Sequence, residues 1–152
     1  MAITRNTKAE MKTLARYLEL IVDPTWDDFH AHRDSPRLAF LACVTIYHAV
    51  DRVAEAEGKE PSHFRQIWAK ESLEFKLVDV IAHHLKHVLS NDERNLGNRP
   101  GLSIGRALGF SEDSDEMNLR SLYFVIRDAV RFVHRKAGTI HPALPEPSVR
   151  QP

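Results

Sequence analysis

The sequence has little of three things that would narrow its function quickly: cysteine, a charge excess and a long apolar run. Its single cysteine, Cys43, excludes a disulfide scaffold and a cysteine-rich zinc site, and it favours a reducing, cytoplasmic environment. The 21 Lys and Arg residues balance the 21 Asp and Glu residues, so no overall field attracts nucleic acid or anionic membranes. The most apolar stretch, residues 38–50, is too short to cross a bilayer and contains His48. We also find no basic segment followed by an apolar one near the start, so a secretory signal is not expected.

Common catalytic motifs are missing as well. The chain contains no Gly-x-Ser-x-Gly, no Walker phosphate loop and no dinucleotide-binding glycine pattern, so nucleotide hydrolysis is not indicated. It also lacks His-Glu-x-x-His and the repeated Glu-x-x-His of di-iron bundles. Cys43 lies inside the apolar stretch, where burial raises the pKa of a thiol and makes it inert.

What the sequence does contain is helical punctuation. Capping residues, prolines and glycines divide it into segments whose apolar residues recur at helical spacing. These signals predict a first helix that begins at Thr4 or Asn6 and ends at Asp23-Pro24, followed by a short segment over 24–34. They then predict a long helix from Ser35 to Gly58 and a short helix from Ser62. A long helix from Ser72 to 90 and a last helix over 115–137, which Gly138 ends, complete the set. The long apolar segment 38–50 should lie at the centre, because it is apolar on nearly every face.

These elements predict an all-α fold, an up-and-down helical bundle of four to five main helices with one long glycine-containing loop over 91–114. A loop of that length is either an ordered excursion or a mobile lid. With 152 residues, 43% of them hydrophobic, the chain fits one domain. We expect a single bundle domain over 1–138 and a loose, proline-rich C-terminal tail over 139–152.

Histidine and carboxylate residues recur at helical spacing in two places. His83 and His87 lie four residues apart and share a helix face, and His48 and Asp51 lie three apart near the end of the central apolar segment. Imidazole and carboxylate are good ligands for zinc or iron, and facing helices of a bundle can bring such pairs together. One hypothesis is therefore a divalent transition-metal site formed by His48, Asp51, His83 and His87. The alternative is structural: a hydrogen-bonded core histidine and a solvated helix flank, with no cofactor.

A basic stripe occupies the last predicted helix. Arg120, Arg127, Arg131 and Arg135 fall within about a quarter-turn of one another, and His134 and Lys136 adjoin them. Such a stripe can bind phosphates, or it can be the polar face of a helix that pairs with acidic residues.

The segment Asp79-Val-Ile-Ala-His83-His84-Leu-Lys86-His87, together with Arg127-Asp128 followed by His134, resembles small bacterial helical proteins related to the HEPN superfamily. The resemblance implies a helical bundle, often dimeric, of which many members are ribonucleases or toxin-like defence components. It implies that His and Arg side chains act on RNA without a metal, while the ribose hydroxyl attacks the adjacent phosphate. On this reading Arg127, His134 and His87 are the candidate catalytic residues.

Three hypotheses follow for the function. The first is a HEPN-like cytoplasmic homodimer that serves as a binding, toxin–antitoxin or defence component. It is expected to contact RNA or a protein partner and not to associate with a membrane. The second is the metal-binding bundle, and the third is a non-catalytic dimeric interaction domain. Whether any catalysis occurs is left open.

Overall fold

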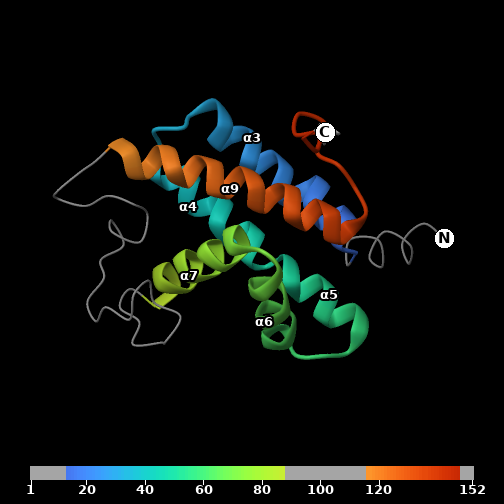
Figure 1. The fold of residues 1–152 in the computed structure, drawn as a ribbon. Helices are drawn as coiled ribbons and strands as arrows, with labels where there is room; N and C mark the ends of the chain where they lie inside the picture. The colour runs from blue at the N-terminus through green and yellow to red at the C-terminus, as the bar shows by residue number, and fades with distance from the viewer. Residues whose placement is uncertain (1–12, 88–115, 148–152) are drawn as a thin grey trace, which may run out of the picture.

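A computed structural model describes residues 13–87 and 116–147 and confirms the all-α fold class (Figure 1). These residues contain no strand, and none of their helices combines the length and the apolar character that a bilayer span requires. The elements are α2 (Leu14–Tyr17), the π-helical segment η1 (Leu18–Val22), α3 (Asp23–Ala31), α4 (Pro36–Tyr47), α5 (Ala49–Glu57), α6 (Pro61–Glu71), α7 (Leu73–His87) and α9 (Glu116–Ala137). The predicted loop 91–114 lies outside the described residues.

Several helix boundaries follow the sequence signals. The Ser35 hydroxyl accepts the backbone N–H of Leu38 at 3.2 Å, directly before Pro36 begins α4. Ser72 caps α7 in the same way, by accepting the N–H of Phe75 at 3.0 Å. Gly138 has a φ of 69°, a left-handed conformation that favours glycine, and it ends α9 as predicted.

The predicted stop at Asp23-Pro24 is wrong, because the helical path continues through it. The π-helical segment η1 precedes α3, and the backbone N–H of Asp23 donates to the carbonyl of Leu18. Pro24 then lies in the first turn of α3, where a missing N–H costs little. The Thr25 hydroxyl donates to the carbonyl of Ile21 at 2.7 Å and so satisfies an acceptor beside the proline.

Two further boundaries differ from the prediction. The helix predicted from Ser35 to Gly58 is divided at His48, whose ψ of −3° departs from the helical value and separates α4 from α5. The next helix begins at Pro61 with Glu60 at its N-cap position, so Ser62 lies inside α6 and does not cap it.

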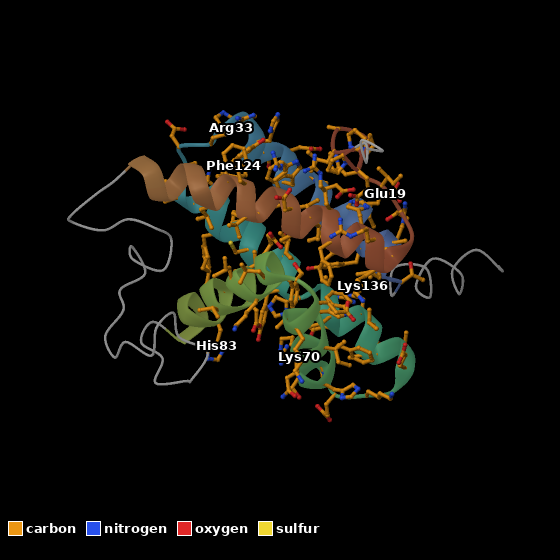
Figure 2. All side chains as sticks on the ribbon, viewed as in Figure 1. Glu19, Arg33, Lys70, His83, Phe124 and Lys136 are labelled. Atoms are coloured by element: carbon orange, nitrogen blue, oxygen red, sulfur yellow. The ribbon has the colours of Figure 1, made fainter. Side chains whose placement is uncertain are left out.

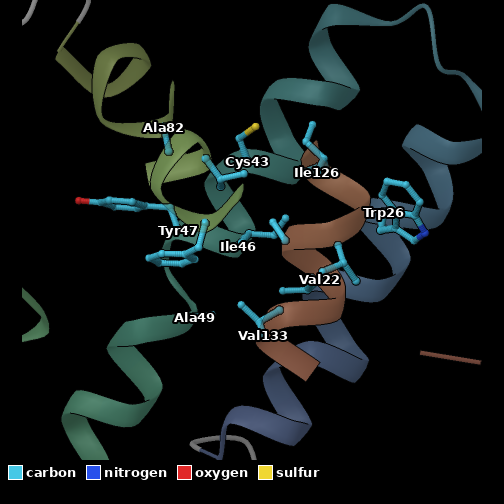
Figure 3. Close-up of a cluster of buried hydrophobic side chains, with 14 of the residues drawn as sticks. Val22, Trp26, Cys43, Ile46, Tyr47, Ala49, Ala82, Ile126 and Val133 are labelled. Carbon is cyan, nitrogen blue, oxygen red and sulfur yellow. The ribbon is translucent and has the colours of Figure 1, made fainter. Parts of the chain in front are cut away.

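Helix α4 lies at the centre of the core, as its apolar sequence predicted. It packs against α3, α7 and α9, and its residues Cys43 and Ile46 are fully buried. Figure 3 shows Ile46 between the side chains of the α3 and α9 layer and those of α7. Because α3, α7 and α9 all pack on α4, its position fixes the relative positions of these helices.

An aromatic cluster joins α6, α7 and α9. The ring centroids of Trp68 and Phe75 lie 5.3 Å apart, and Phe132 of α9 lies 5.7 Å from the former and 5.8 Å from the latter. All three side chains are buried. The cluster therefore holds α6 against α7.

Part of the proline-rich segment after α9 packs on the bundle and is not loose. Leu144 is buried among the core residues, and His141 is 4% exposed. The imidazole Nε2 of His141 lies 3.1 Å from Oδ1 of Asp27 on α3. Residues 139–147 thus return along α3 (Figure 1).

Candidate functional site

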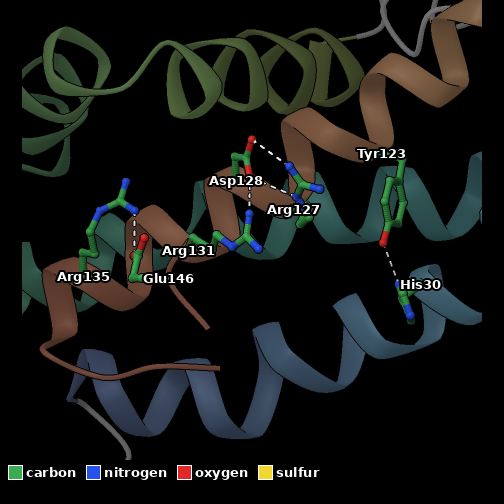
Figure 4. A network of polar contacts seen from close by, with 7 residues as sticks. All are labelled: His30, Tyr123, Arg127, Asp128, Arg131, Arg135 and Glu146. Carbon is green, nitrogen blue, oxygen red and sulfur yellow. Dashed lines mark hydrogen bonds and ion pairs between the residues drawn. The ribbon is translucent and has the colours of Figure 1, made fainter. Parts of the chain in front are cut away.

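The described cations of the basic stripe on α9 are paired with carboxylates (Figure 4), and the side chain of Arg120 lies outside the described residues. The guanidinium of Arg127 contacts the adjacent Asp128 twice, at 3.0 Å from Nε to Oδ1 and 3.3 Å from Nη2 to Oδ2. Arg131 donates to the same Oδ1 at 2.9 Å. Two more cations of the stripe meet carboxylates from other segments: Arg135 with Glu146, at 2.8 Å, and Lys136 with Glu71. This geometry corresponds to the paired polar face of a helix more closely than to an open phosphate-binding stripe.

Two of the three predicted catalytic residues have described side chains. The Arg127 guanidinium lies over the ring of Phe124, 4.9 Å from its centroid, beside Asp128. His134 is 5% exposed and contacts Asp23 of α3. The side chain of His87 lies outside the described residues. The contacts of Arg127 and His134 are therefore made with different partners, and the joint action of the three residues stays a prediction.

The structure describes the side chains of three of the four predicted metal ligands. Nδ1 of His48 lies 2.8 Å from Oδ2 of Asp51, so the first pair does meet at the junction of α4 and α5. His83 is buried on α7. Among the residues that the structure describes, no three His, Cys, Asp or Glu side chains are grouped as metal ligands would be. Because the His87 side chain is outside that part of the chain, the four-residue site stays a prediction.

A groove between α6 and α7 brings together cations that the sequence analysis did not single out. The groove has a volume of about 510 Å³, and its lining includes three cationic side chains, one carboxylate and two neutral polar groups: Arg65, Lys70, Lys76, Asp79, Ser62 and Gln66. Figure 2 shows Lys70 on α6 and His83 further along α7. The single residue Ser72 separates these two helices, so cations on both are held close together.

The cations of this groove are visible in the sequence, but they are divided between two helices. Lys70 precedes the Ser72 cap and Lys76 follows it, so no single helical face contains both. A reading of each helix by itself therefore misses the cluster, whereas the four arginines of α9 stand out because one helix carries them all.

A second pocket lies where the end of α9 meets α2 and α3. Its volume is about 660 Å³, and Asp23, His134 and Thr139 are among its lining residues. Nε2 of His134 lies 2.7 Å from Oδ1 of Asp23, and Nδ1 lies 2.8 Å from Oγ1 of Thr139. A carboxylate, an imidazole and a hydroxyl thus form one continuous chain of contacts.

Neither of these pockets involves the lone cysteine. Cys43 is fully buried, and burial raises the pKa of its thiol to about 12, so it is neutral and unreactive as expected. Tyr17 is also buried; the loss of solvent raises the pKa of its hydroxyl to about 12, against a lowering effect of Arg52. That hydroxyl donates to the carbonyl of Thr45 at 2.6 Å, a structural contact between α2 and α4.

No family model, curated protein or solved structure matches this chain significantly. The functional assignment therefore depends on the geometry and charge of the two pockets.

Proposed function

We propose that this protein binds RNA through its phosphate backbone, in the groove between α6 and α7. The observation that carries the proposal is the local charge of the groove. Among the described lining residues, Arg65, Lys70 and Lys76 stand against one carboxylate, Asp79, although the whole chain has equal numbers of acidic and basic residues. Such a local excess of cations attracts phosphate groups.

The two lysines supply the accessible part of this charge. Lys70 and Lys76 are both exposed, and neither makes an ion pair with any residue that the structure describes. Their ammonium groups are therefore available to a ligand. By contrast, the described cations of the α9 stripe have carboxylate partners that a phosphate would have to displace.

Arg65 is held in place by the protein itself. Its guanidinium lies over the ring of Tyr47, 5.0 Å from the centroid, and 3.9 Å from the carboxylate of Asp51. The ion pair is long, so hydrogen-bond donors of the guanidinium stay available to a phosphate. A pre-positioned arginine loses less freedom on binding than a free one.

The lining of the groove favours contact with the backbone over contact with bases. Ser62 and Gln66 add neutral hydrogen-bond donors of the kind that commonly contact phosphate oxygens. The part of the lining that the structure describes contains no aromatic side chain on which a base could stack. We therefore expect weak selectivity for base sequence and a strong dependence on salt.

The resemblance to HEPN-related proteins supports RNA as the polyanion. The segment 79–87, which carries part of the resemblance, lies on α7 and begins with Asp79 in the groove lining. Membership in that superfamily, a bacterial cytoplasmic location and a homodimeric state belong to the same proposal. Sedimentation analysis of the full chain tests the dimer, since it separates a monomer from a particle of twice its mass.

Fluorescence anisotropy with a labelled single-stranded RNA oligonucleotide tests the binding proposal. If three cations contact phosphates, log K should fall with log salt with a slope of about −2, and affinity should fall roughly 20-fold between 50 and 200 mM salt. Replacing both groove lysines, Lys70→Gln with Lys76→Gln, should reduce the slope to about −0.7.

Lys59→Gln, which removes one charge from an exposed lysine outside the groove lining, is the matched control for the single change Lys70→Gln. It should bind RNA nearly as the wild type does. Equal losses in the control and in Lys70→Gln would contradict the groove as the binding site. A loss confined to Arg131→Gln would move the site to α9.

A further inference from the structure

The pocket at the end of α9 contains a chain of three polar groups whose arrangement follows from the helix ending. Gly138 reverses the chain, its N–H donates to the carbonyl of Arg135 at 3.1 Å, and the N–H of Thr139 donates to the carbonyl of His134 at 3.0 Å. This pair of hydrogen bonds forms a Schellman motif, which folds the residues after the helix back against its last turn. Thr139, the second residue after α9, therefore lies against the turn that contains His134. The Thr139 hydroxyl is thereby held 2.8 Å from Nδ1 of His134.

The contact with Asp23 determines which ring nitrogen of His134 carries the proton. An ionised carboxylate only accepts hydrogen bonds, so Nε2–H donates to Oδ1 of Asp23 at 2.7 Å. In the neutral ring Nδ1 is then an acceptor, and the Thr139 hydroxyl donates to it. The side chains of His134 and Asp23 are 6% and 15% exposed, so water competes little for these contacts.

Such an array has the connectivity of an activated nucleophile: a hydroxyl, a base within hydrogen-bond reach, and a third group that orients the base. It opens on a pocket of about 660 Å³ whose lining also includes the apolar residues Ala15, Ile140 and Pro142. Arg16 lines the pocket too; one of its nitrogens, Nη1, donates to Glu19 at 2.8 Å. The other guanidinium N–H groups are donors of the kind that stabilise a developing oxyanion.

We propose that this pocket is an esterase site for small carboxylic esters, with Thr139 as the nucleophile, His134 as the general base and Asp23 as a positioning residue. The apolar lining suits a short acyl group. The site is separate from the α6–α7 groove and does not depend on RNA binding.

The reaction balances with water as the only co-reactant. Oγ1 of Thr139 bonds to the ester carbonyl carbon while its proton moves to Nδ1 of His134. The bond between the carbonyl carbon and the alcohol oxygen then breaks, and His134 returns the proton to the departing alcohol. Water repeats the sequence on the acyl-threonine and gives the carboxylic acid, so ester and water yield acid and alcohol.

The test is hydrolysis of p-nitrophenyl acetate by the full chain, with mass spectrometry of the acid-quenched protein. We expect an initial burst of p-nitrophenolate and an acetyl group on the peptide that contains Thr139. Thr139→Val should reduce the burst rate at least about 100-fold, while Thr139→Ser should keep the adduct at the same position. Thr25→Val, a matched change outside this pocket, should behave as the wild type.

Asp23→Asn tests the positioning role, since it should lower kcat and change the pH profile with little effect on KM. The proposal would be overturned if acetylation were found only on lysines and if wild type and Thr139→Val hydrolysed the ester equally fast. The contacts among Asp23, His134 and Thr139 would then only stabilise the end of α9. If Thr139→Val fails to fold, acetylation of the wild type and Thr139→Ser decides the question.

Discussion

Replacing Phe132 by leucine should destabilise the bundle and weaken the α6–α7 groove at the same time. The Phe132 side chain is 5% exposed and contacts the rings of Trp68 and Phe75, with centroids 5.7 and 5.8 Å away. Each aromatic pair contributes about 0.5–1.5 kcal/mol beyond burial, so the loss of both should cost about 1–3 kcal/mol. For a chain of this length each kcal/mol lowers Tm by roughly 2–4 °C. Urea unfolding followed by circular dichroism measures the free energy directly.

The matched control for this change is Phe124→Leu on the same helix. Phe124 is 51% exposed, and its ring lies 5.3 Å from that of Tyr123 and beneath the guanidinium of Arg127. Solvent weakens both contacts, so the substitution should cost less than Phe132→Leu. Phe132→Leu should also lower RNA affinity, because the cluster holds the two helices that carry Lys70 and Lys76. Equal destabilisation by the two substitutions would refute the cluster as the support of the groove.

The remaining predictions concern single contacts. Ser72→Ala should lower the free energy of unfolding in urea by about 1 kcal/mol, because it removes the cap of α7. Ser62→Ala should cost much less, because Ser62 lies inside α6. Equal losses in the two variants would contradict the helix boundaries described above. Gly138→Ala should lower Tm by a few degrees owing to backbone strain at φ 69°, and an unchanged Tm would contradict that conformation. Cys43 should react with a thiol reagent at pH 8 only after unfolding, and rapid reaction of the native protein would contradict its burial. Burial raises the pKa of Cys43 and of Tyr17 to about 12 from ordinary values of 9 and 10, so both groups ionise more readily in the unfolded chain. The free energy of unfolding should therefore be unaffected below pH 9 and should fall as the pH rises to about 12. An unfolding free energy that stays constant over that range would contradict the burial of these groups.

The features that were predictable from the sequence depend on local chemistry. Serine followed by proline set the start of α4, and a glycine after a basic turn set the end of α9. The unbroken apolar character of residues 38–50 indicated the central helix. In each case a few neighbouring residues determine the outcome, so no knowledge of tertiary contacts is needed.

The features that were missed depend on distant contacts or on backbone geometry without a residue signature. The junction at His48 contains neither proline nor glycine, and the π-helical segment accommodates a proline that ordinarily indicates a helix end. The contact of His134 with Asp23 joins residues 111 positions apart in the chain, so the sequence alone did not indicate it. The α6–α7 groove likewise depends on how two helices pack, which the aromatic cluster decides.

The most direct test of RNA binding in the groove is an NMR titration of the isotope-labelled chain, whose mass of 17.4 kDa suits backbone amide spectra. Single-stranded RNA is added at low salt and the shifts are mapped to residues. The proposal predicts that the largest changes occur at Gln66, Lys70 and Lys76, and that they disappear at high salt. Changes concentrated between Arg127 and Arg135 on α9, or no changes at any RNA concentration, would contradict it.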